Sequence, residues 1–469
     1  MSARTKTLWT FVITSVALFM VTLDNLVVTT ALPVIRTDLD ASLESLEWTV
    51  NAYTLTFAVL LLTGAALGDR FGRRRVFAIG IGIFTLGSVA AALAPTVEAL
   101  NIARAVQGLG GAIVMPLTLT ILSAAVPKER RGLALGAWGG ISGLAVAFGP
   151  VVGGAVVQGL SWQWIFWLNV PIGILLIPLA LSRLQETHGP GGKLDLPGLG
   201  LVSAGLFGIV WALVRGNGQG WTSPEIIGSL VVGLALVAAF VAWELRTASP
   251  MLPMRFFRKP AFALANLSSL FMFFGMFGSI FLLSQFFQTV QGYSPLSAGL
   301  RILPWTLAPM FVSPIAGVLS DKIPGKTLVG IGLSLQAVSL VWMGLVSTPT
   351  VAYSELIAPF VIAGIGMSLF FAPMANIVLS AVRPQEEGQA SGANNAIREL
   401  GGVFGVAVLA AVFARYGGYE SGQAFSDGMN PALIIGGIVV GFGALAAFAI
   451  PGRPRESEAA VVEPLRDVA

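Results

Sequence analysis

The stretch Leu67-Gly68-Asp69-Arg70-Phe71-Gly72-Arg73-Arg74-Arg75 decides the fold, because it sets a charged turn between two uncharged runs. Residues 48–68 before it and residues 76–97 after it contain no Asp, Glu, Lys or Arg. A helix needs about 20 mostly apolar residues to cross the ~30 Å hydrocarbon core of a bilayer. The stretch is therefore predicted to join two membrane-spanning helices at one membrane surface.

The same pattern extends over the whole chain of 469 residues, of which 55% are hydrophobic and only 11% are charged, with a mean hydropathy of +0.83. Soluble domains average about 45–50% apolar and about 25% charged residues, so a water-soluble enzyme is excluded. The apolar runs are continuous rather than alternating, which favours helices over a β-barrel. We predict an all-α integral membrane protein with fourteen transmembrane helices, at residues 8–33, 47–68, 76–94, 98–126, 133–158, 163–182, 196–214, 224–244, 261–288, 297–319, 327–346, 354–380, 396–414 and 431–450.

The basic residues orient these spans, because cytoplasmic loops retain Lys and Arg. With Met1 inside, the outer segments hold only Arg36, Arg215, Arg301 and Arg415, whereas nearly all other basic residues, Arg398 among them, are counted inside. Both termini are therefore predicted to be cytoplasmic. The first span is longer than a signal-peptide core, and we expect it to be retained. The basic residues that give the net charge of +4 are expected to lie at the inner membrane surface, where anionic lipid headgroups attract them, and not to bind nucleic acid.

Residues suited to enzyme or metal chemistry are scarce. The chain has no Cys and a single His, His188, in a polar loop. Disulfides, thiol nucleophiles and paired-histidine metal sites are excluded. We therefore expect no catalytic residue, no metal and no cofactor, and a membrane-embedded enzyme is the weakest alternative.

An internal repeat divides the chain. An offset of 257 residues aligns Glu98 with Glu355 and Pro116 with Pro373, so the fourth and twelfth spans correspond. We predict two pseudo-symmetric six-helix bundles at residues 1–185 and 260–450, an inserted pair of helices within 186–259, and a disordered cytoplasmic tail at 451–469. Repeated bundles are typical of transporters that rock about a site near mid-membrane.

Two charged residues lie deep in spans of the first bundle, where ionisable groups are costly and suggest function. Asp24 lies ~12 Å from the outer end of the first span, and Arg104 lies ~9 Å below Glu98 in the fourth. We interpret Asp24 as a reversible proton site that Arg104 modulates, with Asn25 and Gln107 offering hydrogen bonds. The alternative is an ion pair that only fastens two helices together.

The other acids in the spans occupy helix ends. Glu47, Glu98, Glu225 and Glu355 all lie where a span is expected to begin, and a carboxylate there is stabilised by the helix dipole. Glu355 is retained as a candidate second acid.

Glycine and proline mark candidate moving parts. In the fifth span, Gly149-xxx-Gly153 allows close helix contact, and Pro150 removes a helical hydrogen bond, which suits a sliding interface. The charged turn containing Asp69, Arg70, Gly72 and Arg73 either anchors the inner surface or pairs with acids such as Glu386, Glu387 or Glu399 of the other bundle in one conformation only.

The ninth span, with its many Phe and Met side chains, forms an adaptable apolar surface. It is expected to face a central cavity that accepts hydrophobic and cationic compounds. We assign Phe277, Phe281, Tyr53 and Trp138 as candidate substrate contacts, together with Asn25 and Gln107.

Several motifs carry a family resemblance. The inner-loop signature of the major facilitator superfamily resembles Asp69–Arg74, and its fourth-span motif resembles Arg104–Gly108. The fifth-span motif of its antiporters resembles Gly149–Gly154. The fourteen-span drug:proton antiporter group has segments that look like Leu23–Pro33, Trp162–Gly173 and Gln291–Leu300. The resemblance implies proton coupling at Asp24, modulation by Arg104, and alternation governed by Asp69 and Gly149-Pro150. Ala65 and Gln163 depart from the motifs. Residues 297–319 contain no acid, so a preference for divalent cations is not expected.

The sequence thus predicts a multi-pass, monomeric protein of the bacterial cytoplasmic membrane. We expect it to export hydrophobic or cationic drugs or secondary metabolites in exchange for protons. A proton-coupled symporter of the same fold is the alternative.

Overall fold

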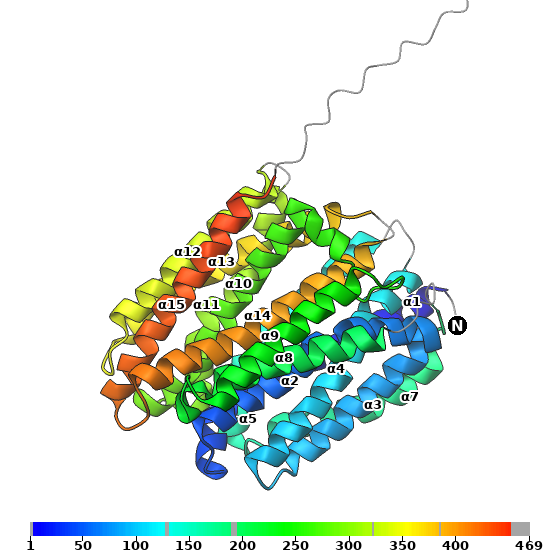
Figure 1. Ribbon diagram of the computed structural model, residues 1–469. Helices are drawn as coiled ribbons and strands as arrows, with labels where there is room; N and C mark the ends of the chain where they lie inside the picture. Colours follow the sequence, from blue (N-terminus) through cyan, green and yellow to red (C-terminus); the bar gives the residue numbers. More distant parts are fainter. Residues whose placement is uncertain (1–2, 127–130, 189–194, 321–322, 384–385, 452–469) are drawn as a thin grey trace, which may run out of the picture.

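The structure is a computed structural model that describes residues 3–126, 131–188, 195–320, 323–383 and 386–451 (Figure 1). Every regular element in these ranges is helical, which confirms the predicted all-α fold. The elements are α1 (Ala3–Asp38), α2 (Leu43–Phe71), α3 (Arg73–Ala92), α4 (Val97–Ala125), α5 (Arg131–Gly159), α6 (Trp164–Trp167), α7 (Asn169–Arg183), α8 (Leu196–Gln219), α9 (Pro224–Glu244), η2 (Met254–Arg258), α10 (Pro260–Gln285), η3 (Phe286–Val290), α11 (Pro295–Ser320), α12 (Gly325–Val346), α13 (Tyr353–Ser380), α14 (Glu387–Tyr416) and α15 (Gly422–Phe448).

Twelve helical segments of the described residues are long and apolar enough to cross a membrane. One of them joins α6 and α7, over Trp164–Arg183, and corresponds to the predicted sixth span. The predicted fifth and tenth spans correspond to α5 and α11, helices of 29 and 26 residues that are not among the twelve. The chain is thus a multi-pass membrane protein.

Several helices run beyond the apolar runs that predicted them. The first helix spans Ala3–Asp38, not 8–33, and α14 and α15 begin about nine residues before the predicted starts at 396 and 431. Polar residues continue a helix because its backbone hydrogen bonds are internal, and side chains cap the exposed N–H groups. Ser421 caps α15 in this way by accepting a hydrogen bond from the Ala424 N–H group. One correction follows: Arg398, assigned to an inner segment, lies within α14.

Helices from the N-terminal part of the chain pack against helices from the C-terminal part along two interfaces, which we call seams. α2 packs on α14, and α5 packs on α11, while α8 lies against α9, α2 and α14. In Figure 1, α3, α4 and α7 lie toward one edge, and α12, α13 and α15 lie toward the other. Residues 452–469, most of the predicted disordered tail, lie outside the described residues.

Candidate functional site: a buried ion pair on five helices

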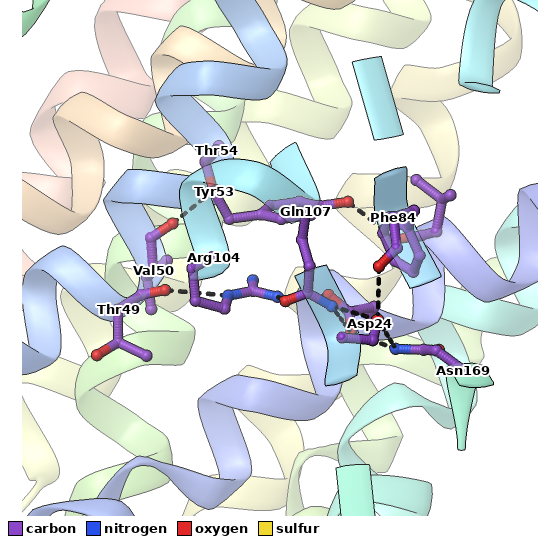
Figure 2. A network of polar contacts seen from close by, with 11 residues as sticks. Asp24, Thr49, Val50, Tyr53, Thr54, Phe84, Arg104, Gln107 and Asn169 are labelled. Atoms are coloured by element: carbon purple, nitrogen blue, oxygen red, sulfur yellow. Dashed lines mark hydrogen bonds and ion pairs between the residues drawn. The ribbon is translucent and has the colours of Figure 1, made fainter. Parts of the chain in front are cut away.

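The two deep charges predicted from the sequence meet in a direct ion pair (Figure 2). Arg104 Nη1 on α4 lies 2.5 Å from Asp24 Oδ2 on α1. The exposed fraction is 3% for Asp24 and 0% for Arg104. Inserting a charged side chain at the centre of a membrane helix costs about 2.5–3.5 kcal/mol, and the opposite charge of the partner offsets part of this cost for both residues.

The second carboxylate oxygen of Asp24 accepts two amide donors. Asn169 Nδ2, at the start of α7, lies 2.7 Å from Oδ1, and Gln107 Nε2, on α4, lies 3.2 Å from it. Both amides also contact the Ser88 hydroxyl of α3, at 3.4 and 2.8 Å. Asp24 therefore has donors on both oxygens, and the network ties α1, α3, α4 and α7 together.

A fifth helix, α2, contributes through Arg104. Nε donates to the Thr49 carbonyl at 3.2 Å, and the guanidinium carbon lies 4.2 Å from the centre of the Tyr53 ring. The Tyr53 hydroxyl donates to the Val21 carbonyl of α1 at 3.3 Å. Arg104 Nη1 also donates to Gln107 Oε1, but the buried Nη2 has no hydrogen-bond partner in the described residues. A cation on an aromatic face is stabilised by about 0.5–2 kcal/mol, so Tyr53 helps to fix the guanidinium.

The structure brings together four of the residues singled out in the sequence: Asp24, Arg104, Gln107 and Tyr53. Tyr53 and Gln107, assigned to substrate, are engaged with the ion pair. Asn25 does not join it: the buried Asn25 Oδ1 accepts no hydrogen bond in the part of the chain that the structure describes.

The remaining candidates are dispersed. Phe277 and Phe281 are buried in α10, where the Phe277 ring stacks on Phe273 with centroids 5.9 Å apart. Glu355 is exposed in the first turn of α13. The side chain of Trp138, in α5, lies outside the described residues.

Sequence reasoning missed Asn169 and Ser88. Asn169 lies within the motif Trp162–Gly173, in an apolar run. A single polar side chain among apolar residues of a span was the signal that could have indicated a functional role. Glu399 was also missed as a deep acid: it lies three residues from the start of the predicted span 396–414, whereas the observed α14 begins at Glu387 and places it 12 residues into the helix.

The charged turn between α2 and α3 forms its ion pairs with nearby residues. Asp69 Oδ1 accepts from Arg73 at 2.8 Å, and the Arg74 N–H group donates to Glu186 Oε1, after α7, at 2.9 Å. Arg70 is exposed beside Phe71. Glu386 pairs with Arg255 instead of with this turn, no ion pair among the described residues joins the turn to Glu399, and the side chain of Glu387 lies outside the described residues. Gly72 adopts φ +102°, a conformation that favours glycine.

The Gly149-Pro150 segment of α5 contacts helices on both sides. A Cβ at Gly149 would lie 2.7 Å from Leu26 Cβ of α1. A Cβ at Gly299 of α11 would lie 2.2 Å from the Pro150 carbonyl oxygen. Only glycine permits this approach, so α5 is held closely between α1 and α11.

Comparison with known families identifies the chain. A family model described as Major Facilitator Superfamily matches residues 14–406, and it matches again over residues 265–465. The chain belongs to the major facilitator superfamily. The family resemblance seen in the motifs is confirmed, and the chain is a membrane transporter rather than an enzyme.

Relatives within the superfamily include resistance and export proteins. The chain is 35% identical to the multidrug resistance protein Stp of Mycobacterium tuberculosis, over 88% of this chain and 77% of the relative. It is 36% identical to the cephamycin export protein CmcT of Amycolatopsis lactamdurans, over 88% and 86%. It is 33% identical to the methylenomycin A resistance protein of Streptomyces coelicolor, over 94% and 91%.

Solved transporter structures share the fold at low sequence identity. A bacterial homologue of the human lysosomal transporter Spinster, in an inward-facing and unoccupied conformation, has a TM-score of 0.67 at 18% identity, covering 94% of this chain and 96% of that one. A POT family transporter in complex with 5-aminolevulinic acid has a TM-score of 0.68 at 16% identity, covering 93% and 94%.

Proposed function

We propose that this protein exports hydrophobic, often cationic, drugs or secondary metabolites across the bacterial cytoplasmic membrane in exchange for protons. The observation that carries the proposal is the Asp24–Arg104 pair, a carboxylate and a guanidinium buried together between α1 and α4. A buried pair is a weak way to stabilise a protein, so its retention inside spans favours a functional role.

The chemistry follows from what one proton does to this pair. Protonated Asp24 is neutral and has an O–H donor in place of one acceptor. The attraction to Arg104 is then lost, and the hydrogen bonds from Asn169 and Gln107 weaken because charge-assisted bonds are the stronger ones. A single proton thus acts on contacts that join five helices. Arg104 retains its charge throughout, because guanidinium does not deprotonate in proteins.

The proposed architecture is that of an alternating-access transporter. The twelve apolar segments, together with α5 and α11, give fourteen spans with both termini cytoplasmic. Residues 1–185 and 260–450 form the two units that rock, and 186–259 contributes the inserted pair α8 and α9. Support comes from the seams α2–α14 and α5–α11, where the two units meet, and from the repeated family match.

The substrate class is proposed from the relatives and from α10. The names of the relatives specify multidrug resistance, cephamycin export and methylenomycin A resistance. The α10 helix adds a buried series of Phe and Met side chains, an apolar surface that accommodates varied shapes.

Reconstituted liposomes test the proposal. With an imposed pH gradient and a panel of lipophilic cations, we expect substrate-evoked proton movement in the wild type and in the control E420Q, which changes an exposed acid. We expect its loss in D24N, because the amide cannot exchange a proton. Unchanged proton movement in D24N would refute proton coupling at this site. A lower melting temperature with an unchanged exchange ratio would favour the alternative that the pair only fastens helices.

A further inference from the structure

A second charged site lies on α14, outside the Asp24 network. Glu399 is 12 residues from the start of this 30-residue helix, which places it ~18 Å along the axis. The buried Glu399 Oε2 accepts no hydrogen bond, and Glu399 forms no ion pair with a residue that the structure describes. A carboxylate at such depth with an unused oxygen needs a partner, because an unpaired charge is costly in a membrane.

The position of Glu399 faces the seam between α14 and α2. Residues seven apart lie on one face of a helix, and Gly392 is seven residues before Glu399. A Cβ at Gly392 would lie 2.6 Å from Leu62 Cδ2 of α2, and Val403, one turn after Glu399, shares an apolar cluster with Leu55 of α2. The carboxyl group thus lies where the two ends of the sequence pack together.

Aromatic rings beside Arg398, the residue before Glu399, already accept a cation. The guanidinium of Arg398 lies 4.3 Å from the centre of the Phe273 ring and 5.2 Å from that of Phe371. Phe273 stacks on Phe277, and a Cβ at Gly402 would lie 3.2 Å from Phe277 Cδ2. Because Gly402 is three residues from Glu399, the Phe277 ring and the carboxyl group lie on neighbouring faces of α14. Carboxylate and ring faces together suit a cation with apolar substituents.

Asp24 is poorly suited to the same task. Both of its oxygens already accept donors from Arg104, Gln107 and Asn169, so a cationic ligand would have to displace them. We propose that Glu399, with Phe277 beside it, recognises the positive charge of an organic cation, while Asp24 serves the proton. This inference rests on the proposed export function. It assigns the two positive charges that are exchanged, the organic cation and the proton, to separate carboxylates.

Binding of tetraphenylphosphonium to the full-length protein in nanodiscs tests the proposal without a pH gradient. We expect E399Q to weaken binding at least tenfold, E399D to retain binding within about threefold, and the control E420Q, at an exposed acid, to match the wild type. Binding of a neutral lipophilic dye is expected to be unchanged in all four proteins. Equal tetraphenylphosphonium affinity in E399Q and the wild type would overturn the proposal, as would parallel loss of the neutral dye.

The absence of native Cys provides a second measurement that does not depend on the affinity of E399Q. In A396C, three residues before Glu399 and with its carboxyl group intact, a cationic methanethiosulfonate reagent should modify the thiol, and tetraphenylphosphonium should slow the reaction increasingly as its concentration rises. An unreactive or unprotected thiol would contradict the assignment. Failure of wild-type proton exchange in liposomes, with these binding results intact, would instead refute the proposed antiport and leave the cation site standing.

Discussion

The contact between α5 and α11 gives a quantitative prediction for the substitution G154A. A Cβ at Gly154 would lie 2.3 Å from the Pro295 carbonyl oxygen and 2.7 Å from Leu296 Cα. Both are backbone atoms, so no side-chain rotation can relieve the overlap. The two helices would have to separate by about 1.1 Å to reach the 3.4 Å of an ordinary contact.

The energetic consequence is a shift between conformations. Overpacking a close contact costs about 1–3 kcal/mol. If the α5–α11 contact exists only in the conformation seen here, G154A raises the free energy of this conformation alone. A difference of 1–3 kcal/mol changes the population ratio by about 5- to 150-fold.

Thiol labelling at Ser284 measures that shift. Ser284 on α10 is fully buried, and its hydroxyl donates to the Thr29 carbonyl of α1 at 2.9 Å, so a thiol there reacts only when α1 and α10 part. With S284C as the only Cys, we expect G154A to raise labelling by a membrane-impermeant maleimide at least fivefold.

The matched control lies on the same helix. A Cβ at Gly159 would meet nothing within 4 Å, so G159A should label at the rate of S284C alone. Equal labelling in G154A and G159A would show that the close approach does not hold this conformation, and the steric reasoning would be wrong.

Two further predictions concern the ion pair and the charged turn. N169A removes a hydrogen bond to a charged oxygen, which is typically worth about 1.5–3 kcal/mol, so export in liposomes should fall at least tenfold. S88A removes a hydroxyl that does not touch Asp24, so it should reduce export much less than N169A. Equal reductions in export by S88A and N169A would argue against direct support of Asp24 by Asn169. G72A forces a left-handed φ on alanine and places a Cβ 2.8 Å from the Glu186 carboxyl group. We expect a stability loss of about 1–3 kcal/mol or more, read as a lower melting temperature in detergent. G220A, at φ +86° with nothing within 4 Å, carries the backbone strain alone, so equal melting temperatures would exclude the Glu186 clash.

Helix positions and deep charges were predictable because both depend on local properties of the chain. A run such as residues 76–94 satisfies its own backbone hydrogen bonds and must be apolar to face lipid, so composition alone reveals it. The depths of Asp24 and Arg104 followed from counting residues along their helices. Polar helix ends were misjudged for the same reason: the first turns of α14 resemble a loop in composition, so Glu399 was placed three residues from the start of its span instead of 12.

Other contacts depend on how the helices pack. Tyr53 was assigned as a candidate substrate contact, and the structure adds that the guanidinium of Arg104 lies on its ring. The turn arginines were considered partners of Glu386 or Glu399, yet Glu186 accepts from Arg74. Neither outcome is encoded in spacing, since each depends on which faces of two distant helices meet.

Composition and residue counting alone were enough to predict that this chain crosses a membrane many times, with an acid and an arginine deep in its first and fourth spans. The packed helices were needed to show that Asn169, 145 residues from Asp24 in sequence, donates to it, and that Glu399 Oε2 accepts no hydrogen bond from the described residues. The physical reason is that hydropathy and helical periodicity are properties of one segment, whereas the pairing of side chains depends on how each helix is rotated. That rotation is set by close contacts such as Gly154 on Pro295, which only the packed helices reveal.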